Sequence, residues 1–166
     1  MIKSERTICF SGHRREKMPK GKALEVLEER LVGEIEKAIG DGYDTFLFGG
    51  CYGFDLTAAA MVLSRKRRID FLNPRRIRLI AIIPFENQAL HWRESDRALY
   101  YDIMPQCDDV ITLSLRYHDK CYADRNQYMT ERSSRLICYW DGELRSGTAQ
   151  TIRMAQNQGM EIINLY

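Results

Sequence analysis

The sequence has no long apolar run, no closely spaced pair of cysteines and no strong excess of charge of one sign. Its longest apolar run, LIAIIPF, is far shorter than the ~20 residues that cross a bilayer, and the opening MIKSERTICF lacks the apolar core of a signal peptide. We therefore expect a cytoplasmic protein that does not enter a membrane. The five cysteines are scattered and include no CxxC pair, which favours reduced thiols and predicts neither a disulfide framework nor a metal site.

The charges nearly balance, because 25 basic and 23 acidic residues leave a formal net charge of +2. Domains that bind nucleic acid through their charge are usually clearly basic, so the composition does not favour nucleic acid as a partner. One local basic cluster comprises Arg65, Lys66, Arg67, Arg68, Arg75, Arg76 and Arg78. We expect its first four residues to end a helix, where cations complement the helix dipole. We expect the cluster to form a solvated surface, a partner site or a crystal contact on the edge of the sheet opposite the ligand site.

Apolar residues follow two periods that alternate along the whole chain. Short apolar runs predict strands at 7–10, 45–48, 77–84, 110–114, 136–140 and 161–166, and apolar residues three and four apart predict helices at 24–38, 55–68, 90–104, 124–133 and 148–158. This alternation predicts an α/β, Rossmann-like fold, with a doubly wound, mostly parallel six-stranded sheet and helices on both faces. The nearly apolar run at 77–84 predicts a central strand. Because no linker or composition break divides the chain, we expect one domain over 1–166.

In a doubly wound sheet the ligand binds beyond the carboxyl ends of the strands, so the segments that follow strands form the candidate site. Gly49, Gly50 and Gly53 lie between a strand and a helix in the run GGCYGFD. Backbone N–H groups of such a loop, together with the helix N-terminus, predict a cradle for an anion such as phosphate. Asp55 then has two interpretations: it caps the helix, or its carboxylate binds a ribose hydroxyl beside the phosphate.

The segments after the first and third strands add further polar groups to the same edge. Ser11 and Gly12 permit a tight turn. Arg14 can bind a phosphate through two hydrogen bonds, and His13 can donate or accept a proton. The alternative interpretation of this segment is a basic turn exposed to solvent. Glu86, after the third strand, is by default an exposed carboxylate. It becomes a candidate site residue because residues 11–14 are expected at the same edge of the sheet.

The segments after the fourth and fifth strands complete the edge. We expect 115–129 to be the longest irregular stretch, and its cations and aromatic residues suit the binding of a phosphate and an aromatic ring. Within it, Arg125 and Asn126 are the predicted ligand-binding residues. A second anion cradle is predicted where a glycine and two hydroxyl residues begin the last helix, at Ser146, Gly147 and Thr148.

Five motifs stand in order along the chain: SGHR, GGCYGFD, IPFENQ with Trp92, YADRNQYM and SGT. With them the chain resembles the YpsA-like family of the SLOG group of Rossmann-like proteins, and the resemblance covers nearly the whole chain. The SLOG group also takes in the Lonely Guy phosphoribohydrolases and the SLOG domain of the DNA-processing protein DprA. The resemblance implies a Rossmann-like domain that binds a nucleotide-derived ligand, and it implies no established reaction.

The chain departs from the Lonely Guy pattern at the residue that matters for catalysis. Arg125 falls where those enzymes carry an arginine ahead of a methionine, here Met129, and the run 146–148 falls on their Gly-Gly-x-Gly-Thr loop with one glycine lost. Their catalytic glutamate corresponds to Thr151. A threonine cannot act as a carboxylate base or stabilise an oxocarbenium ion. The resemblance therefore supports a phosphate site without supporting the phosphoribohydrolase reaction.

Three functions remain open. The first is binding or sensing of a nucleotide-derived ligand, such as a nucleotide or an ADP-ribose or NAD-type compound, because the sequence offers several anion-binding groups and no recognisable pair of nucleophile and base. The second is hydrolysis of a nucleotide or N-glycosidic bond, with Asp55 or Glu86 as the catalytic candidates. The third, by analogy with DprA, is binding of single-stranded nucleic acid through the cluster from Arg65 to Arg78. The sequence leaves a homo-oligomer open.

Overall fold

The computed structural model describes residues 2, 4–72 and 76–166. Its strands are β1 (Thr7–Gly12), β2 (Thr45–Phe48), β3 (Arg78–Ile83), β4 (Asp109–Thr112), β5 (Arg135–Tyr139) and β6 (Glu161–Asn164). Its α-helices are α1 (Lys22–Gly40), α2 (Phe54–Leu72), α3 (Glu94–Ile103), α4 (Cys121–Glu131) and α5 (Gly147–Asn157). Over the described residues, no helix is both long enough and apolar enough to cross a membrane.

The strands form one sheet in the order β4-β3-β2-β1-β5-β6, and all neighbouring pairs are parallel. This topology confirms the predicted doubly wound, Rossmann-like sheet. The chain adds β2, β3 and β4 on one side of β1 and then adds β5 and β6 on the other side. Where the strand order reverses, between β1 and β5, a crevice is expected at the carboxyl ends of the strands. The strand β3 is interior, but it lies next to the edge strand β4 and not in the middle of the sheet.

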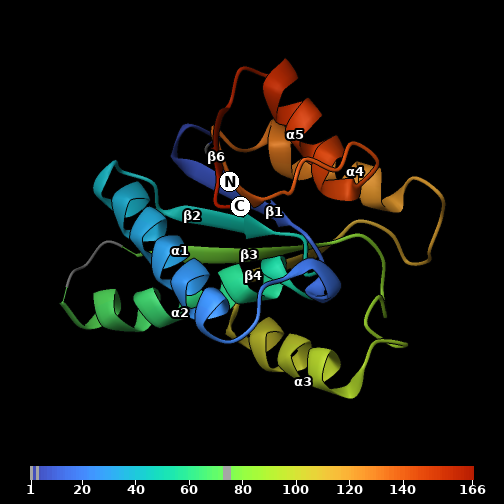
Figure 1. Ribbon diagram of the computed structural model, residues 1–166, viewed down its shortest axis with the longest axis horizontal. Helices are drawn as coiled ribbons and strands as arrows, with labels where there is room; N and C mark the ends of the chain where they lie inside the picture. The colour runs from blue at the N-terminus through green and yellow to red at the C-terminus, as the bar shows by residue number, and fades with distance from the viewer. Residues whose placement is uncertain (1, 3, 73–75) are drawn as a thin grey trace.

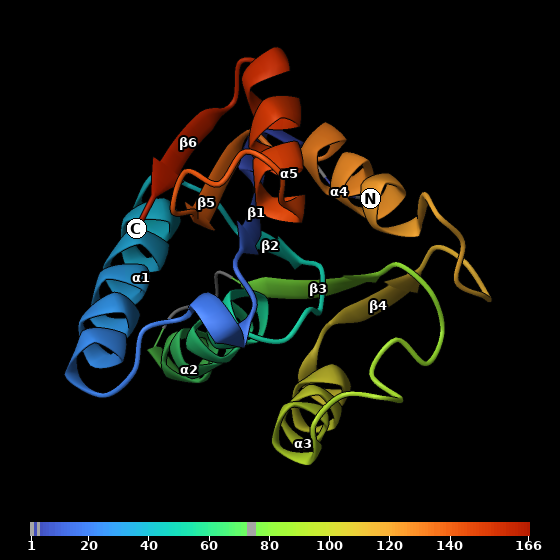
Figure 2. The same cartoon turned by 45° about the vertical axis from the view of Figure 1, so that its right-hand side comes forward.

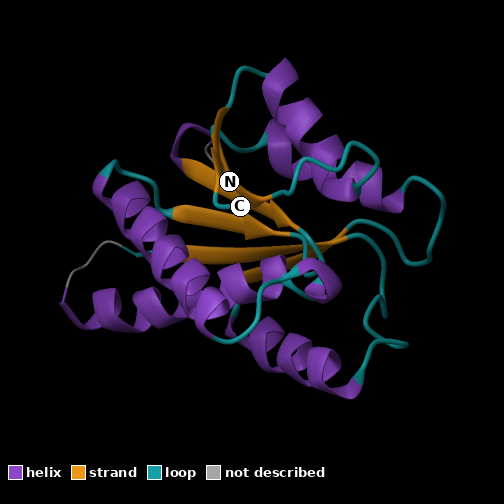
Figure 3. Ribbon diagram, viewed as in Figure 1, coloured by secondary structure: helices purple, strands orange, loops and turns teal. Residues whose placement is uncertain are grey.

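Helices cover both faces of the sheet, with α1, α2 and α3 on one face and α4 and α5 on the other (Figures 1 and 2). Figure 3 shows the strands enclosed between these two layers. Because successive residues of a strand point to opposite faces, Phe10 of β1 packs in the core that contains Phe54 of α2, whereas Cys9 packs in the core that contains Met129 of α4 and Ile152 of α5. Both faces of β1 are therefore buried, which explains why its run TICF does not alternate with charged residues.

Three helix boundaries differ from the prediction by more than two residues. Helix α2 continues to Leu72, so the basic residues 65–68 stand before its last turn and do not end it. Helix α3 begins at Glu94 because the preceding residues form turns, with Asn87 at φ 58° and the Leu90 N–H donating to its carbonyl. Helix α4 begins at Cys121. The stretch predicted to be irregular at 115–129 is therefore helical over its second half.

Part of the basic cluster is paired within the protein. Arg65 forms an ion pair of 3.0 Å with Glu36, and Lys66 forms one of 2.6 Å with Asp108. Arg75 lies outside the described residues. The cluster runs from α2 to the amino end of β3, which is the edge of the sheet opposite the carboxyl ends of the strands. These pairs give the cluster a structural use that needs no external partner.

Candidate functional site

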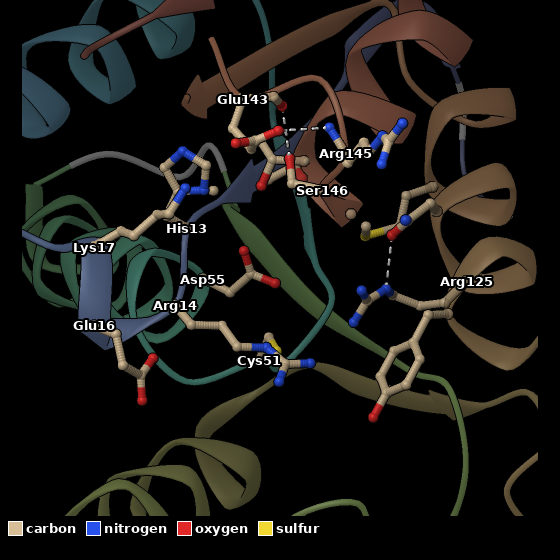
Figure 4. A pocket seen from close by; sticks show the side chains of 17 residues that line it. His13, Arg14, Glu16, Lys17, Cys51, Asp55, Arg125, Glu143, Arg145 and Ser146 are labelled. Carbon is tan, nitrogen blue, oxygen red and sulfur yellow. Dashed lines mark hydrogen bonds between the residues drawn. The ribbon is translucent and has the colours of Figure 1, made fainter. Parts of the chain in front are cut away.

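A cavity of about 510 Å³ opens at the carboxyl ends of β1 and β5, beside α4 and α5 (Figure 4). It lies at the reversal of the strand order, and its volume is in the range of small-molecule sites. The predicted site residues that line it are Ser11, Gly12, His13, Arg14, Asp55, Arg125, Asn126, Ser146, Gly147 and Thr148. The lining residues that were not predicted as site residues are Glu16, Lys17, Cys51, Tyr122, Met129, Glu143 and Arg145.

Four predicted site residues do not line the cavity: Gly49, Gly50, Gly53 and Glu86. Glu86 is exposed to solvent, and its backbone N–H donates to the carbonyl of Ser114. Of the two catalytic candidates, only Asp55 is therefore a carboxylate of this cavity.

The glycine-rich loop packs closely around the protein's own groups. A Cβ at Gly49 would lie 2.6 Å from Nη1 of Arg125, and a Cβ at Gly53 would lie 2.6 Å from the backbone nitrogen of Arg15. Gly53 also has a φ of +98°, a conformation that favours glycine. Because Gly49 has no side chain, there is room for the buried Arg125 side chain, and because Gly53 has none, there is room for the segment after β1. Their predicted contact with a ligand stays a prediction, and the geometry supplies a different reason for their presence.

Asp55 is held beneath the cavity by the same loop. It is 5% exposed, and burial raises the pKa of its carboxyl to about 6, against the lowering effects of the Arg125 charge and of backbone hydrogen bonds from Cys51, Gly49 and Gly12. Helix α2 begins at Phe54, so Asp55 is its second residue. The cap position before the helix is occupied by Gly53, whose carbonyl accepts the N–H of Thr57, and not by Asp55. The carboxylate is therefore an internal anion in the loop that was predicted to cradle an external one.

Replacing Asp55 by asparagine is expected to remove a pH dependence of stability. The carboxyl pKa is about 6 in the folded protein, against an ordinary value of 3.8 for an aspartate in water, so the folded state holds the proton more tightly. The stability that this group contributes is complete below pH ~4 and is lost as the pH rises through ~6, by roughly 3 kcal/mol.

Urea unfolding of the wild type and of Asp55→Asn between pH 4 and pH 8 measures this effect. Asparagine does not titrate, so the difference in unfolding free energy between the two proteins should change by that amount across the range. A difference that is the same at every pH would contradict the assignment.

Arg125 and Asn126 lie in the first turns of α4, where they form a buried polar group beside the cavity. The Arg125 Nη1 donates to the carbonyl of Gly49 at 3.0 Å, and its Nε donates to Oδ1 of Asn126 at 2.9 Å. Asn126 in turn donates from Nδ2 to Oε1 of Gln150 in α5 at 3.2 Å. These bonds fix the guanidinium, which faces the cavity toward Asp55 in Figure 4. Arg125 can therefore bind an anion with little further loss of conformational entropy.

His13 is joined to the loop that follows β5. Its Nε2 lies 2.7 Å from Oδ1 of Asp141, and Oδ2 of Asp141 accepts from Lys17 at 3.0 Å. The backbone N–H of Glu143, then Lys17 and then His13 hold the pKa of Asp141 well below its usual range. One ring nitrogen of His13, Nε2, is thus engaged with Asp141, and His13 connects the loops that follow β1 and β5.

The N-terminus of α5 forms another wall of the cavity. Ser146 caps this helix, because its Oγ accepts from the N–H of Ala149 at 3.1 Å. Gly147 and Thr148 line the cavity at the start of the helix, where N–H groups lack partners within the helix and the dipole favours an anion. Thr151 is fully buried and donates to the carbonyl of Gly147 at 3.1 Å. No carboxylate therefore stands where the Lonely Guy enzymes carry theirs.

Charged side chains of both signs surround the cavity, with the cations Arg14, Lys17, Arg125 and Arg145 and the anions Glu16, Asp55 and Glu143. Figure 4 shows Arg145 and Ser146 on one side of the cavity and Arg14 and Cys51 on the other, with Asp55 between them. Among the described residues, no group of three or more His, Cys, Asp or Glu side chains is placed to hold a metal ion. The arrangement is chemically suited to an anionic organic ligand.

Comparison with solved structures agrees with the fold. The structure of DNA processing protein A from Streptococcus pneumoniae superposes with a TM-score of 0.64 at 15% identity, over 96% of this chain and 50% of that chain. The structure of TM1055, a structural genomics target, superposes with a TM-score of 0.57 at 15% identity, over 95% of this chain and 72% of that chain. At such low identity these likenesses show the fold alone.

Comparison of sequences shows the family. The UPF0398 protein of Bacillus cereus strain B4264 is 24% identical over 145 residues, which are 86% of this chain and 76% of the relative. The UPF0398 protein of Halalkalibacterium halodurans is 26% identical over 133 residues, 79% of this chain and 66% of the relative. The model of the YspA SLOG family matches residues 8–164. The chain therefore belongs to the YspA SLOG family.

Proposed function

We propose that the cavity binds a nucleotide-type ligand, with a phosphate group between the N-terminus of α5 and the guanidinium groups of Arg14 and Arg125, and that binding or sensing this ligand is the function of the protein. The observation that carries the proposal is the convergence of a helix N-terminus and two arginines on one crevice at the reversal of the sheet. Each of these features favours phosphate, through charge-assisted hydrogen bonds and through the helix dipole.

A nucleotide fits the cavity better than a free phosphate does. A volume of about 510 Å³ exceeds the needs of one phosphate group. The Asp55 carboxylate lies between the two walls (Figure 4), where a ribose hydroxyl can donate to it. A ligand with a phosphate, a sugar and a further group can therefore place its phosphate at α5 and the two arginines, a sugar hydroxyl at Asp55 and the further group in the remaining volume of the cavity.

Calorimetric titration of the intact protein with AMP, ADP-ribose and NAD⁺ tests the proposal. We expect at least one of them to bind saturably and to raise the melting temperature. At a concentration of ~100 times Kd, linkage predicts roughly 2.7 kcal/mol of added stability. If none of the three binds, the proposal is wrong.

Replacing Gly147 by aspartate is expected to weaken binding of that nucleotide roughly tenfold or more, because a carboxylate would stand where the phosphate lies. The fold should be unaffected. A Cβ at Gly147 meets nothing within 4 Å, and an acidic residue in the first turn of a helix is favourable. Gly33→Asp is the matched control, since Gly33 is an exposed residue of α1, away from the cavity, and its Cβ also meets nothing within 4 Å. Equal affinity of the two variants would remove α5 from the site.

A second candidate function is hydrolysis of an N-glycosidic or phosphate bond in the same ligand, and the position of Asp55 favours it. A carboxyl that lines the cavity with a pKa raised to about 6 can exchange a proton near neutral pH. Incubation of the protein with AMP, followed by chromatography for adenine, adenosine and ribose 5-phosphate, tests this function. Release by the wild type that is lost in Asp55→Asn would make the protein a hydrolase, and no release would leave it a binding protein.

Nucleic acid is not the ligand that we propose. The fold is shared with DNA processing protein A, but likeness of fold does not carry function. The basic cluster that would contact a strand lies at the opposite edge from the cavity, and Arg65 and Lys66 are paired with Glu36 and Asp108. A mobility-shift titration with single-stranded oligonucleotides should show no complex at concentrations at which a nucleotide saturates the cavity.

A further inference from the structure

Tyr122 provides the cavity with an aromatic wall. Among the described residues that line the cavity it is the only tyrosine, phenylalanine or tryptophan. It stands in the first turn of α4 and is half-buried. Tyr117, in the loop before this helix, is 60% exposed and does not line the cavity. Of these two tyrosines of the predicted polar stretch, only Tyr122 therefore lines the cavity.

Neighbouring rings hold Tyr122 in place. The Phe85 ring lies 6.0 Å from the Tyr122 ring between centroids, at an interplanar angle of 80°, and the Tyr117 ring lies 6.4 Å away at 59°. The first of these is an edge-to-face pair, which is a favourable arrangement, and the second is tilted. The Tyr122 ring is therefore supported by two other rings, which limits the conformational entropy that it would lose on binding.

Tyr122 lies near Arg125, Arg14 and Cys51. The guanidinium carbon of Arg125 lies 5.6 Å from the Tyr122 ring centroid. Burial raises the pKa of the Tyr122 hydroxyl, Cys51 raises it further, and Arg14 lowers it. In Figure 4, Arg14 and Cys51 lie across the cavity from Arg145 and Ser146. The Tyr122 ring is therefore close to the two arginines that we propose to bind the phosphate.

With the phosphate between α5 and the guanidinium groups of Arg14 and Arg125, the base lies beside these groups, where Tyr122 is the one tyrosine, phenylalanine or tryptophan among the described residues that line the cavity. We propose that Tyr122 is a stacking platform for the planar base of the ligand, so that the site selects nucleotides over sugar phosphates. The inference rests on the proposed function. Because every base has an aromatic face, stacking assigns the class of ligand and not the identity of the base.

The test compares AMP with ribose 5-phosphate, which lacks the base. We expect the wild type to bind AMP roughly tenfold or more tightly than ribose 5-phosphate, and Tyr122→Leu to weaken AMP binding roughly ten- to a hundredfold. Ribose 5-phosphate should bind both proteins alike. Tyr122→Phe keeps the ring and should bind AMP within about threefold of wild type. Tyr101→Leu is the control, since Tyr101 is an exposed tyrosine of α3 that neither lines the cavity nor contacts Tyr122 in a ring pair.

The outcomes are distinct. Urea unfolding of each ligand-free variant shows whether it is folded, and the preference of the wild type for AMP tests the inference even if Tyr122→Leu does not fold. Equal binding of AMP and ribose 5-phosphate to the wild type, equal weakening of both by Tyr122→Leu, or a loss in Tyr122→Phe as large as in Tyr122→Leu would each overturn the stacking role. If the wild type binds neither compound while ADP-ribose and NAD⁺ also fail to bind, the proposed function itself is wrong.

Discussion

Replacing Gly53 by alanine is expected to lower the free energy of unfolding by roughly 2 to 5 kcal/mol. Two costs add. The residue has a φ of +98°, which is unfavourable for alanine, and the new Cβ would lie 2.6 Å from the backbone nitrogen of Arg15 and 2.7 Å from the carbonyl oxygen of His13. Backbone atoms cannot rotate away, so the segment after β1 must shift, and with it the bond of 3.1 Å between the Phe54 N–H and the His13 carbonyl. Guanidinium chloride unfolding measures the loss.

Gly42 offers a control with nearly the same backbone. Its φ is +99°, and a Cβ there would meet nothing within 4 Å. Gly42→Ala should therefore show only the conformational cost, about 1 to 2 kcal/mol. The excess loss in Gly53→Ala measures the close approach between the loops after β1 and β2. If both variants lose the same stability, that approach is not the reason for a glycine at position 53.

The fold could be predicted because burial leaves a periodic pattern wherever the buried face is apolar. In β1 the run TICF is buried on both faces, and in α1 the residues Leu27, Leu31, Ile35 and Ala38 are the buried ones. Helix α4 breaks this rule. Its buried face includes Arg125, Asn126 and Thr130 beside Cys121 and Met129. A helix that buries polar groups beside a cavity has no clear apolar period, so the sequence predicts a helix only from 124 and assigns the first turn of α4 to an irregular polar stretch.

The candidate site could be placed by topology but not resolved in detail. Glycines after β2 indicated that some group approaches the backbone there, and a glycine pattern is the same whether that group is a ligand or a distant part of the chain. At Gly49 the group is Arg125, 76 positions away. No local signal in the sequence connects the two. Glu143 and Arg145 were within reach of sequence reasoning, because they follow β5 in the same segment as Ser146.

Replacing Arg125 by methionine is expected to lower the free energy of unfolding by roughly 3 to 5 kcal/mol near pH 8. Methionine keeps an unbranched apolar stem but removes the hydrogen bonds to the Gly49 carbonyl and to Asn126, and both acceptors are buried. It also removes the positive charge that lowers the pKa of the Asp55 carboxyl. Urea unfolding at pH 5 and at pH 8 measures the loss. If Arg125→Met costs less than about 1 kcal/mol at pH 8, Arg125 is not part of the buried support of the site.

The pH dependence of that loss separates the hydrogen bonds from the charge. At pH 5, below the pKa of about 6, the Asp55 carboxyl is mostly protonated in the folded protein, so the charge of Arg125 has little to stabilise and the loss should reflect the hydrogen bonds alone. At pH 8 the same carboxyl is ionised in the wild type, and the loss should be larger. Adding Asp55→Asn to Arg125→Met removes the titrating group, so the cost of losing Arg125, measured against Asp55→Asn, should become the same at both pH values. A loss that stays pH-dependent in the Asp55→Asn background would mean that Arg125 acts on another titrating group. The proposed electrostatic interaction between Arg125 and the Asp55 carboxylate would then be wrong.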